Sequence, residues 1–162
     1  MASMFDITGA CVAVPGGGGV LCGAMARALA AAGAKVAVID YNLAGAQAVA
    51  KAIAGDGGTA VAVGANVLEK AAVEKALADT LEAFGRVDVL VNGAGGNKKD
   101  ATSAPPVAFF GLPADPIRCV FELNCLGTIL PSQVFGRYMA GRGEGNIINI
   151  SSMNAFRPLT NI

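Results

Sequence analysis

The amino-acid sequence predicts an α/β protein, in which helices cover both faces of a doubly wound parallel sheet in three layers. Short apolar runs alternate with longer stretches whose apolar residues recur every three or four positions, as strands and helices do when they alternate. Four consecutive glycines follow the first apolar run, and an aspartate, Asp40, closes the second. Strands separated by crossover helices pair in parallel, so these three observations favour one parallel sheet.

Five runs are predicted as strands because they are short, apolar or β-branched, and bounded by glycine or polar residues. Residues 59–65 are almost wholly apolar, which is typical of a strand buried on both faces. The predicted strands are residues 11–14, 35–39, 59–65, 87–91 and 146–150.

Four stretches are predicted as helices, at residues 20–32, 43–54, 68–84 and 116–141. Gly85 is expected to end the third helix, and Pro131 to kink the fourth. Residues 97–115 are expected to form a loop long enough to be functional or mobile.

The composition fits one globular domain that spans residues 1–162. Apolar residues make up 54% of the chain and charged residues 15%, which favours a folded chain with a sizeable core over a disordered one. Twelve basic and twelve acidic residues cancel, which gives no reason to expect nucleic acid or an anionic membrane as a partner. The chain has no histidine, so Ser-His-Asp catalysis and histidine-based metal sites are excluded, and no metal site is predicted.

The cysteines and the apolar runs predict a cytoplasmic protein. The four cysteines have no metal-ligand spacing and stand in apolar surroundings, as buried thiols of a cytoplasmic protein do. No apolar run is long enough to span a membrane, and the N-terminal residues lack the pattern of a signal peptide. The cysteines are Cys11, Cys22, Cys119 and Cys125.

The glycine run predicts a dinucleotide site. Glycines let the main chain lie against a diphosphate, and the helix that follows directs its free N–H groups toward the phosphates. Asp40 lies 24 positions after Gly16, where its carboxylate can accept hydrogen bonds from ribose hydroxyls. A glycine cluster can also be a flexible turn, but the order of strand, helix, strand and acid favours the dinucleotide. A P-loop is rejected because no lysine follows the glycines.

Three motifs resemble the short-chain dehydrogenase/reductase family over essentially the whole chain. They are Gly-Gly-Gly-Gly-Val-Leu-Cys at 16–22, Asn-Gly-Ala-Gly-Gly-Asn at 92–97 and Ile-Ser-Ser-Met-Asn-Ala-Phe-Arg-Pro-Leu-Thr at 150–160, and they are similar to the D-mannonate oxidoreductase-like (fructuronate-reducing) branch. The resemblance implies a Rossmann-like fold with strand order 3-2-1-4-5. It also implies a hydride transfer between NAD(H) and the hydroxyl or ketone of a sugar acid such as D-mannonate or D-fructuronate.

The resemblance assigns site residues position by position. Ser152 matches the serine that orients the substrate, and Asn124 the helix asparagine whose main-chain carbonyl holds a water in a proton relay. Without the family, Asn124 would be interpreted as a helix residue satisfied by packing. Asn66 stands where the family usually has an Asp that receives the adenine amino group, and an amide oxygen can accept that bond too. The implied cofactor-binding residues are Gly16, Gly17, Gly18, Gly19, Val20, Leu21, Asp40, Asn66, Val67, Asn92, Gly93, Ala94 and Gly95.

The chain departs from the family's Thr-Gly-x-x-x-Gly-x-Gly motif. Pro15 stands at the threonine, and Val20 and Cys22 replace the second and third glycines. Asp40 matches the acid that selects NAD. Tyr41 follows it and no cation stands beside it or in the glycine turn, so NAD is favoured over NADP.

The family's proton donor, a Tyr with a Lys four residues on, would lie about thirteen residues past Ser152 and beyond Ile162. We therefore expect the chain to be the N-terminal portion of a single NAD(P)-binding domain, truncated before that segment and inactive by itself. The alternative is a non-catalytic dinucleotide-binding module or an inactive fragment.

The partners implied are a sugar-acid substrate and further copies of the chain, as a tetramer or dimer. Lys98, Lys99 or Arg157 could meet the substrate carboxylate, although surface cations of this kind are usually only solvated.

Overall fold

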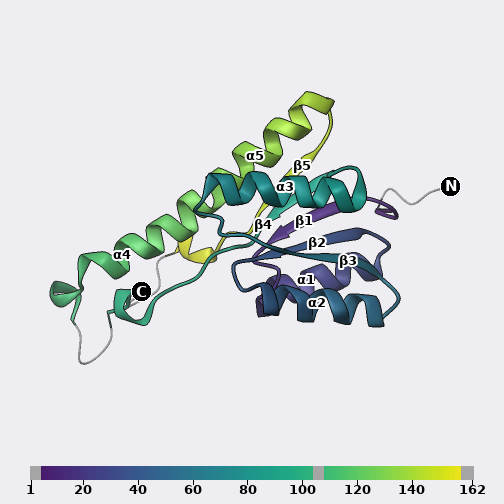
Figure 1. The fold of residues 1–162 in the computed structure, drawn as a ribbon. Helices are drawn as coiled ribbons and strands as arrows, with labels where there is room; N and C mark the ends of the chain where they lie inside the picture. The colour runs from purple at the N-terminus through teal and green to yellow at the C-terminus, as the bar shows by residue number, and fades with distance from the viewer. Residues whose placement is uncertain (1–4, 104–107, 158–162) are drawn as a thin grey trace.

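The computed structural model describes residues 5–103 and 108–157, and they form one five-stranded parallel sheet. The strand order is β3-β2-β1-β4-β5, as expected (Figure 1). Each predicted strand is present, with ends that differ by one or two residues. The strands are β1 (Cys11–Pro15), β2 (Lys35–Asp40), β3 (Thr59–Gly64), β4 (Val89–Asn92) and β5 (Asn146–Asn149).

Helices cover both faces of the sheet, which makes the three layers expected from the sequence. Figure 1 shows α1 and α2 on one face and α3 and α5 on the other. The α-helices are α1 (Val20–Ala31), α2 (Leu43–Gly55), α3 (Lys70–Phe84), α4 (Ala114–Phe121) and α5 (Gly127–Arg142). Short 3₁₀ turns are η1 (Lys99–Ala101), η2 (Phe109–Gly111) and η4 (Met153–Ala155).

The central strands are buried on both faces because successive side chains of a strand point to opposite sides. In β1, Ala13 packs in the core cluster under α3 and α5, whereas Val12 and Val14 pack in the cluster under α1 and α2. In β2, Ala37 and Val38 divide between the two clusters in the same way. This double burial holds β1 and β2 between the two helical layers.

One strand is less buried than expected. The apolar run at 59–65 was expected to be covered on both faces, but in β3 only Val63 is buried. The reason is the position of β3 at the edge of the sheet, where it pairs with β2 alone. The sequence pattern distinguishes apolar from polar runs but does not tell an edge strand from a central one.

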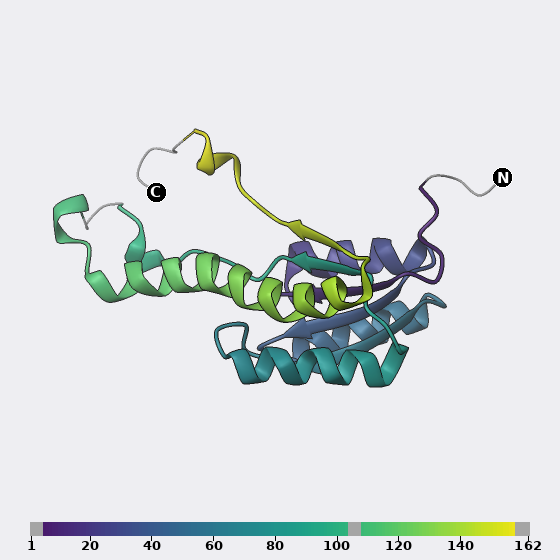
Figure 2. The same cartoon turned by 90° about the horizontal axis from the view of Figure 1, so that it is seen from above.

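The helix expected at 116–141 is built from three segments. A π turn, η3 (Glu122–Leu126), separates α4 from α5, and the N–H of Gly127 donates to the carbonyl of Glu122 five residues before it. Pro131 lies inside α5, which continues to Arg142, so the irregular turn precedes the proline instead of forming at it. Figure 2 shows that the long helix extends beyond the carboxyl ends of the strands.

The helix ends and the cysteines test further predictions. Gly85 ends α3 in the left-handed conformation at φ 77°, as expected.

Cys11 and Cys22 are buried, but Cys119 is half-buried and Cys125 is exposed, so the prediction of four buried thiols was wrong for Cys119 and Cys125. Both lie on the part of the long helix that extends past the sheet, where there is little to cover them.

Candidate functional site

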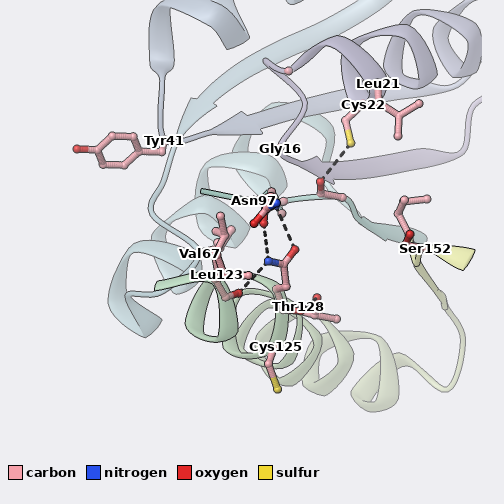
Figure 3. Close-up of a pocket in the computed structure, with 18 of the residues that line it drawn as sticks. Gly16, Leu21, Cys22, Tyr41, Val67, Asn97, Leu123, Cys125, Thr128 and Ser152 are labelled. Carbon is pink, nitrogen blue, oxygen red and sulfur yellow. Dashed lines mark hydrogen bonds between the residues drawn. The ribbon is translucent and has the colours of Figure 1, made fainter. Parts of the chain in front are cut away.

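A cleft of about 1190 Å³ lies at the carboxyl ends of the strands, where β1 and β4 are neighbours but their connections run to opposite faces of the sheet. Ligands of open α/β sheets bind at such a switch point. Figure 3 shows Tyr41 on one side of the cleft and Ser152 on the other, with Gly16 and Asn97 between them.

The glycine turn after β1 forms the floor of the cleft. Gly16 adopts φ 81°, and a Cβ there would lie 2.8 Å from the backbone nitrogen of Ala94. The N–H of Gly17 donates to the carbonyls of Val14 and Ile39, at 3.1 and 3.0 Å, which ties the turn to β1 and β2. Only glycine fits at position 16, because both the backbone conformation and the close approach exclude a side chain.

The N-terminus of α1 opens onto this floor without a side-chain cap. Gly19 is the N-cap residue and offers no side chain, so the first N–H groups of the helix stay available. Val20 and Leu21, in the first turn, are exposed and line the cleft. Uncapped N–H groups at the positive end of a helix suit a diphosphate.

Asp40, at the end of β2, is held over the glycine turn. Its Oδ2 accepts the N–H of Gly18 at 3.0 Å, and its Oδ1 accepts the N–H of Asn42 at 2.8 Å. A Cβ at Gly18 would lie 3.0 Å from this carboxyl group, so that glycine leaves room for it. A carboxylate with two such bonds keeps lone pairs for ribose hydroxyls. Among the described residues that line the cleft, no other is charged.

The side of the cleft beyond Asp40 suits an adenine ring. Tyr41 is exposed, and Ala65 and Val67 present buried apolar side chains. The Oδ1 of Asn66 accepts the N–H of Leu68 at 3.1 Å, so one of its lone pairs is already used. An oxygen of this kind can still accept one further hydrogen bond.

The wall opposite α1 is formed by the segment after β4. The thiol of Cys22 donates to the carbonyl of Gly93 at 3.4 Å (Figure 3). Farther along, the side chain of Asn124 holds both backbone groups of Gly96: its Oδ1 accepts the N–H at 3.1 Å, and its Nδ2 donates to the carbonyl at 2.7 Å. The same Nδ2 donates to the carbonyl of Val120 at 2.8 Å. Asn124 therefore anchors this wall to the π turn.

Asn92 lies beneath the cleft. It is 3% exposed, and its Nδ2 donates at 2.8 Å to Ser132 Oγ and to Asn149 Oδ1. These bonds join the carboxyl ends of β4 and β5 to α5. Its role in this structure is to hold the sheet together under the site.

The end of the cleft beyond β5 carries the groups with catalytic potential. Ser152 is exposed, and its Oγ accepts the N–H of Asn154 at 3.2 Å, which leaves its own proton free to donate. The main-chain carbonyl of Asn124 accepts Thr128 Oγ1 at 3.2 Å and has a second lone pair for a further donor. The catalytic roles expected for these two residues stay predictions.

Most of the expected site residues share this cleft. Gly17, Gly18 and Asn92 stand behind its wall, and the other residues expected to bind the cofactor or to act in catalysis line it. Lys98, Lys99 and Arg157 are exposed and do not line it.

Sequence reasoning missed several wall residues. Five cleft residues on the long helix, called the missed stripe, lie one, three or four positions from Asn124 in the sequence. The spacings of three and four are those of neighbours on a helix surface, so they could have identified part of this stripe. Asn154 was also missed, because no spacing linked it to the glycine turn. The missed stripe is Val120, Phe121, Leu123, Cys125 and Thr128.

The described residues carry neither a metal-binding cluster nor a membrane-spanning helix. In the part of the chain that the structure describes, no three His, Cys, Asp or Glu residues are placed to hold a metal ion. Within the same residues, no helix combines the length and the apolar character needed to cross a membrane.

Residues 10–162 match the short chain dehydrogenase family. An uncharacterized oxidoreductase of Haemophilus influenzae is 41% identical over 161 residues, which cover 93% of this chain and 56% of that protein. The uncharacterized oxidoreductase UxuB of Bacillus subtilis is 42% identical over 165 residues, covering 97% of this chain and 59% of that protein.

A solved structure matches the fold closely. A candidate D-mannonate oxidoreductase from Haemophilus, crystallised with bound NAD, superposes with a TM-score of 0.92 at 42% identity. The match covers 97% of this chain and 60% of that protein. The chain thus spans less than two thirds of the length of each of these three proteins.

Proposed function

The chain belongs to the short-chain dehydrogenase family, and on that premise we propose that it forms the coenzyme-binding part of an NAD-dependent oxidoreductase. The proposed reaction interconverts the hydroxyl and the ketone of a sugar acid, such as D-mannonate and D-fructuronate. The motifs at 92–97 and 150–160 support this substrate class, as does the name of the NAD-bound relative.

The observation that carries the proposal is the placement of Asp40. Its carboxylate, hydrogen-bonded to Gly18, faces the position where an adenosine ribose would lie once the diphosphate rests on α1. A 2′-phosphate there would meet this carboxylate, and no Lys or Arg among the described lining residues could offset the repulsion. This favours NAD over NADP.

The chain's own residues have separate roles in the proposed reaction. The uncapped N-terminus of α1 binds the diphosphate, and Gly16 lets it approach the main chain. Asn124 holds the wall at Gly96, and Ser152 offers a hydroxyl to the reacting oxygen of the substrate. NAD, when bound, supplies the nicotinamide carbon that accepts the hydride.

The proton donor is expected from a Tyr-x-x-x-Lys pair outside these 162 residues. Neither Tyr41 nor Tyr138 has a lysine four positions on, because Gly45 and Arg142 stand there. We propose further that the enzyme assembles as a homo-tetramer or homo-dimer. The four unpaired cysteines suit a reducing compartment, the cytoplasm.

Two measurements test the proposal. Calorimetric titration of the purified chain with NAD, and separately with NADP, should give saturable binding of NAD and binding of NADP weaker by at least about tenfold. The second measurement follows NADH oxidation at 340 nm with D-fructuronate, using a protein in which this chain is continued through a Tyr-x-x-x-Lys segment. Tighter binding of NADP would overturn the assignment of the coenzyme. A lack of turnover with every keto sugar acid would remove the substrate class.

A further inference from the structure

Cys22 and Gly93 meet across the cleft as a close steric pair. Cys22 is the third residue of α1 and is 4% exposed, and Gly93 is the first residue after β4. A Cβ built on Gly93 would lie 2.2 Å from the sulfur of Cys22 but 3.6 Å from its Cβ. The sulfur therefore occupies most of the space that a side chain at position 93 would need, and the carbonyl oxygen of Pro15, 3.3 Å from such a Cβ, is a second and milder close contact.

The backbone at Gly93 is held from three directions. The Cys22 thiol donates to its carbonyl at 3.4 Å, and its N–H donates to the carbonyl of Pro15 at 3.2 Å. Gly16 packs so closely on the other side that a Cβ there would lie 2.9 Å from the carbonyl carbon of Gly93. The contact made by Pro15 comes from the end of β1, and the contact made by Gly16 comes from the glycine turn. The contact from Cys22 is made by a side chain, so a substitution at position 22 can change it without changing the backbone contacts.

We infer that Cys22 is a positioning residue for the coenzyme: by filling the space at Gly93 and holding its carbonyl, it sets the distance between the Gly93–Ala94 wall and the floor at Gly16. The inference rests on the proposed function, because this gap lies beside the expected diphosphate. It assigns the thiol no chemical step.

The protonation state of the Cys22 thiol agrees with this positioning role. Burial raises the pKa of Cys22, and the negative charge of Asp40 raises it further. The sulfur therefore stays protonated at neutral pH and acts as a hydrogen-bond donor, not as a nucleophile.

The test is a double-mutant cycle with NAD affinity and thermal unfolding as separate readouts. Gly93→Ala places a methyl group on the sulfur, so NAD affinity should fall more than about tenfold, and the Tm should drop by about 5 °C. Cys22→Ala should weaken NAD binding by about threefold to tenfold, because one hydrogen bond and its packing are lost. In the double variant the two methyl carbons would be 3.6 Å apart, an ordinary contact, and the remaining close neighbour would be the Pro15 carbonyl oxygen at 3.3 Å. NAD affinity should then return to within about threefold of Cys22→Ala alone.

Two controls separate positioning from general stability. Cys22→Ser keeps a donor in place and should bind NAD within about threefold of the unaltered chain. Cys11 is also a buried thiol, but it begins β1 at the end of the strand remote from the cleft, so Cys11→Ala should lower the Tm and leave NAD affinity unchanged.

The outcomes are distinct. Additive losses in the double variant, or a loss of NAD affinity in Cys11→Ala equal to that in Cys22→Ala, would overturn the inference. If the unaltered chain binds no NAD, the proposed function fails instead. The Tm values of the unaltered chain, the two single variants and the double variant would still report whether positions 22 and 93 are coupled.

Discussion

Asp40 and Gly18 are joined by a hydrogen bond of 3.0 Å from the backbone N–H to Oδ2, so the carboxylate at the end of β2 is fixed to the glycine turn after β1. Two adjacent strands thereby present one site with a defined spacing. The charge is oriented before any ligand arrives, which lowers the cost of binding.

Replacing Asp40 should change the choice of coenzyme. In Asp40→Asn the side chain keeps its shape but loses its charge and part of its accepting capacity. NAD affinity should fall by about tenfold, and NADP affinity should hold or rise because the repulsion is gone. Titration with both coenzymes checks this result. Asp56→Asn, whose exposed carboxylate pairs with Arg27, is the matched control and should change neither affinity.

Gly16 and Gly57 provide a matched pair of alanine substitutions. Their φ angles are 81° and 82°, but a Cβ would meet the backbone of Ala94 at Gly16 and nothing within 4 Å at Gly57. Gly57→Ala should cost about 1 kcal/mol, the strain of a left-handed alanine alone. Gly16→Ala should cost at least about 2 kcal/mol more and abolish NAD binding. Urea unfolding followed by circular dichroism measures both, and equal costs would contradict the role assigned to Gly16.

Asn124 should be more sensitive to aspartate than to alanine. Asn124→Ala loses three hydrogen bonds at a partly exposed site, which should cost about 1–2 kcal/mol and weaken NAD binding severalfold. Asn124→Asp is closer in shape, but its second oxygen would face the carbonyls of Gly96 and Val120 without a proton to share. It should therefore be the less stable variant at pH 7. Greater stability of the aspartate variant would show that these bonds do not hold the wall.

The pH dependence of folding should report the ionisation of Asp88, the residue directly before β4. Burial raises its pKa, but hydrogen bonds from Arg86 and from the N–H of Cys11, with the charge of Arg86, outweigh burial and hold the pKa below its ordinary value of 3.8. A carboxyl group whose pKa is lower in the folded state stabilises the fold fully above its unfolded pKa. That stabilisation is lost as the pH falls through the folded value.

Asp88→Asn should therefore cost about 2 kcal/mol at pH 7, and the difference from the unaltered chain should shrink as the pH falls through the folded pKa of Asp88. Urea unfolding at several pH values measures it. Asp115→Asn, which removes an exposed partner of Arg118, should cost less than about 0.5 kcal/mol at any pH. A difference at Asp88 that grows as the pH falls would contradict this account.

The resemblance to the family predicted the strand order, whereas the local succession of strand, glycines, helix, strand and acid predicted the glycine-to-Asp40 unit. Apolar periodicity determines which runs become strands, and the spacing from Gly16 to Asp40 is the length of one strand–helix–strand unit. The sequence predicted that the main chain at Gly16 lies close to a ligand. Its contact with the backbone of Ala94 could not be predicted, because Ala94 follows a strand distant in the sequence and only the folded chain brings the two together.

The errors arose where tertiary position decides. The exposure of Cys125 depends on how far the long helix extends past the sheet, and the exposure of β3 on its place at the edge. The π turn at Glu122–Leu126 has no recognised sequence signal, because it depends on which carbonyl each N–H reaches in the folded helix. The Cys22–Gly93 pair was invisible for the same reason: the two residues are 71 positions apart.

The strand β5 has a practical consequence for work with this protein. It pairs only with β4 in the described sheet, all four of its residues are exposed, and Ile147 and Ile148 are 37% and 46% accessible. Unprotected strand edges of this kind recruit other strands. Concentrated stocks of these 162 residues by themselves should therefore turn turbid on storage, whereas dilute ones should stay clear. A lysine placed at Ile148 should extend shelf life without disturbing the cleft.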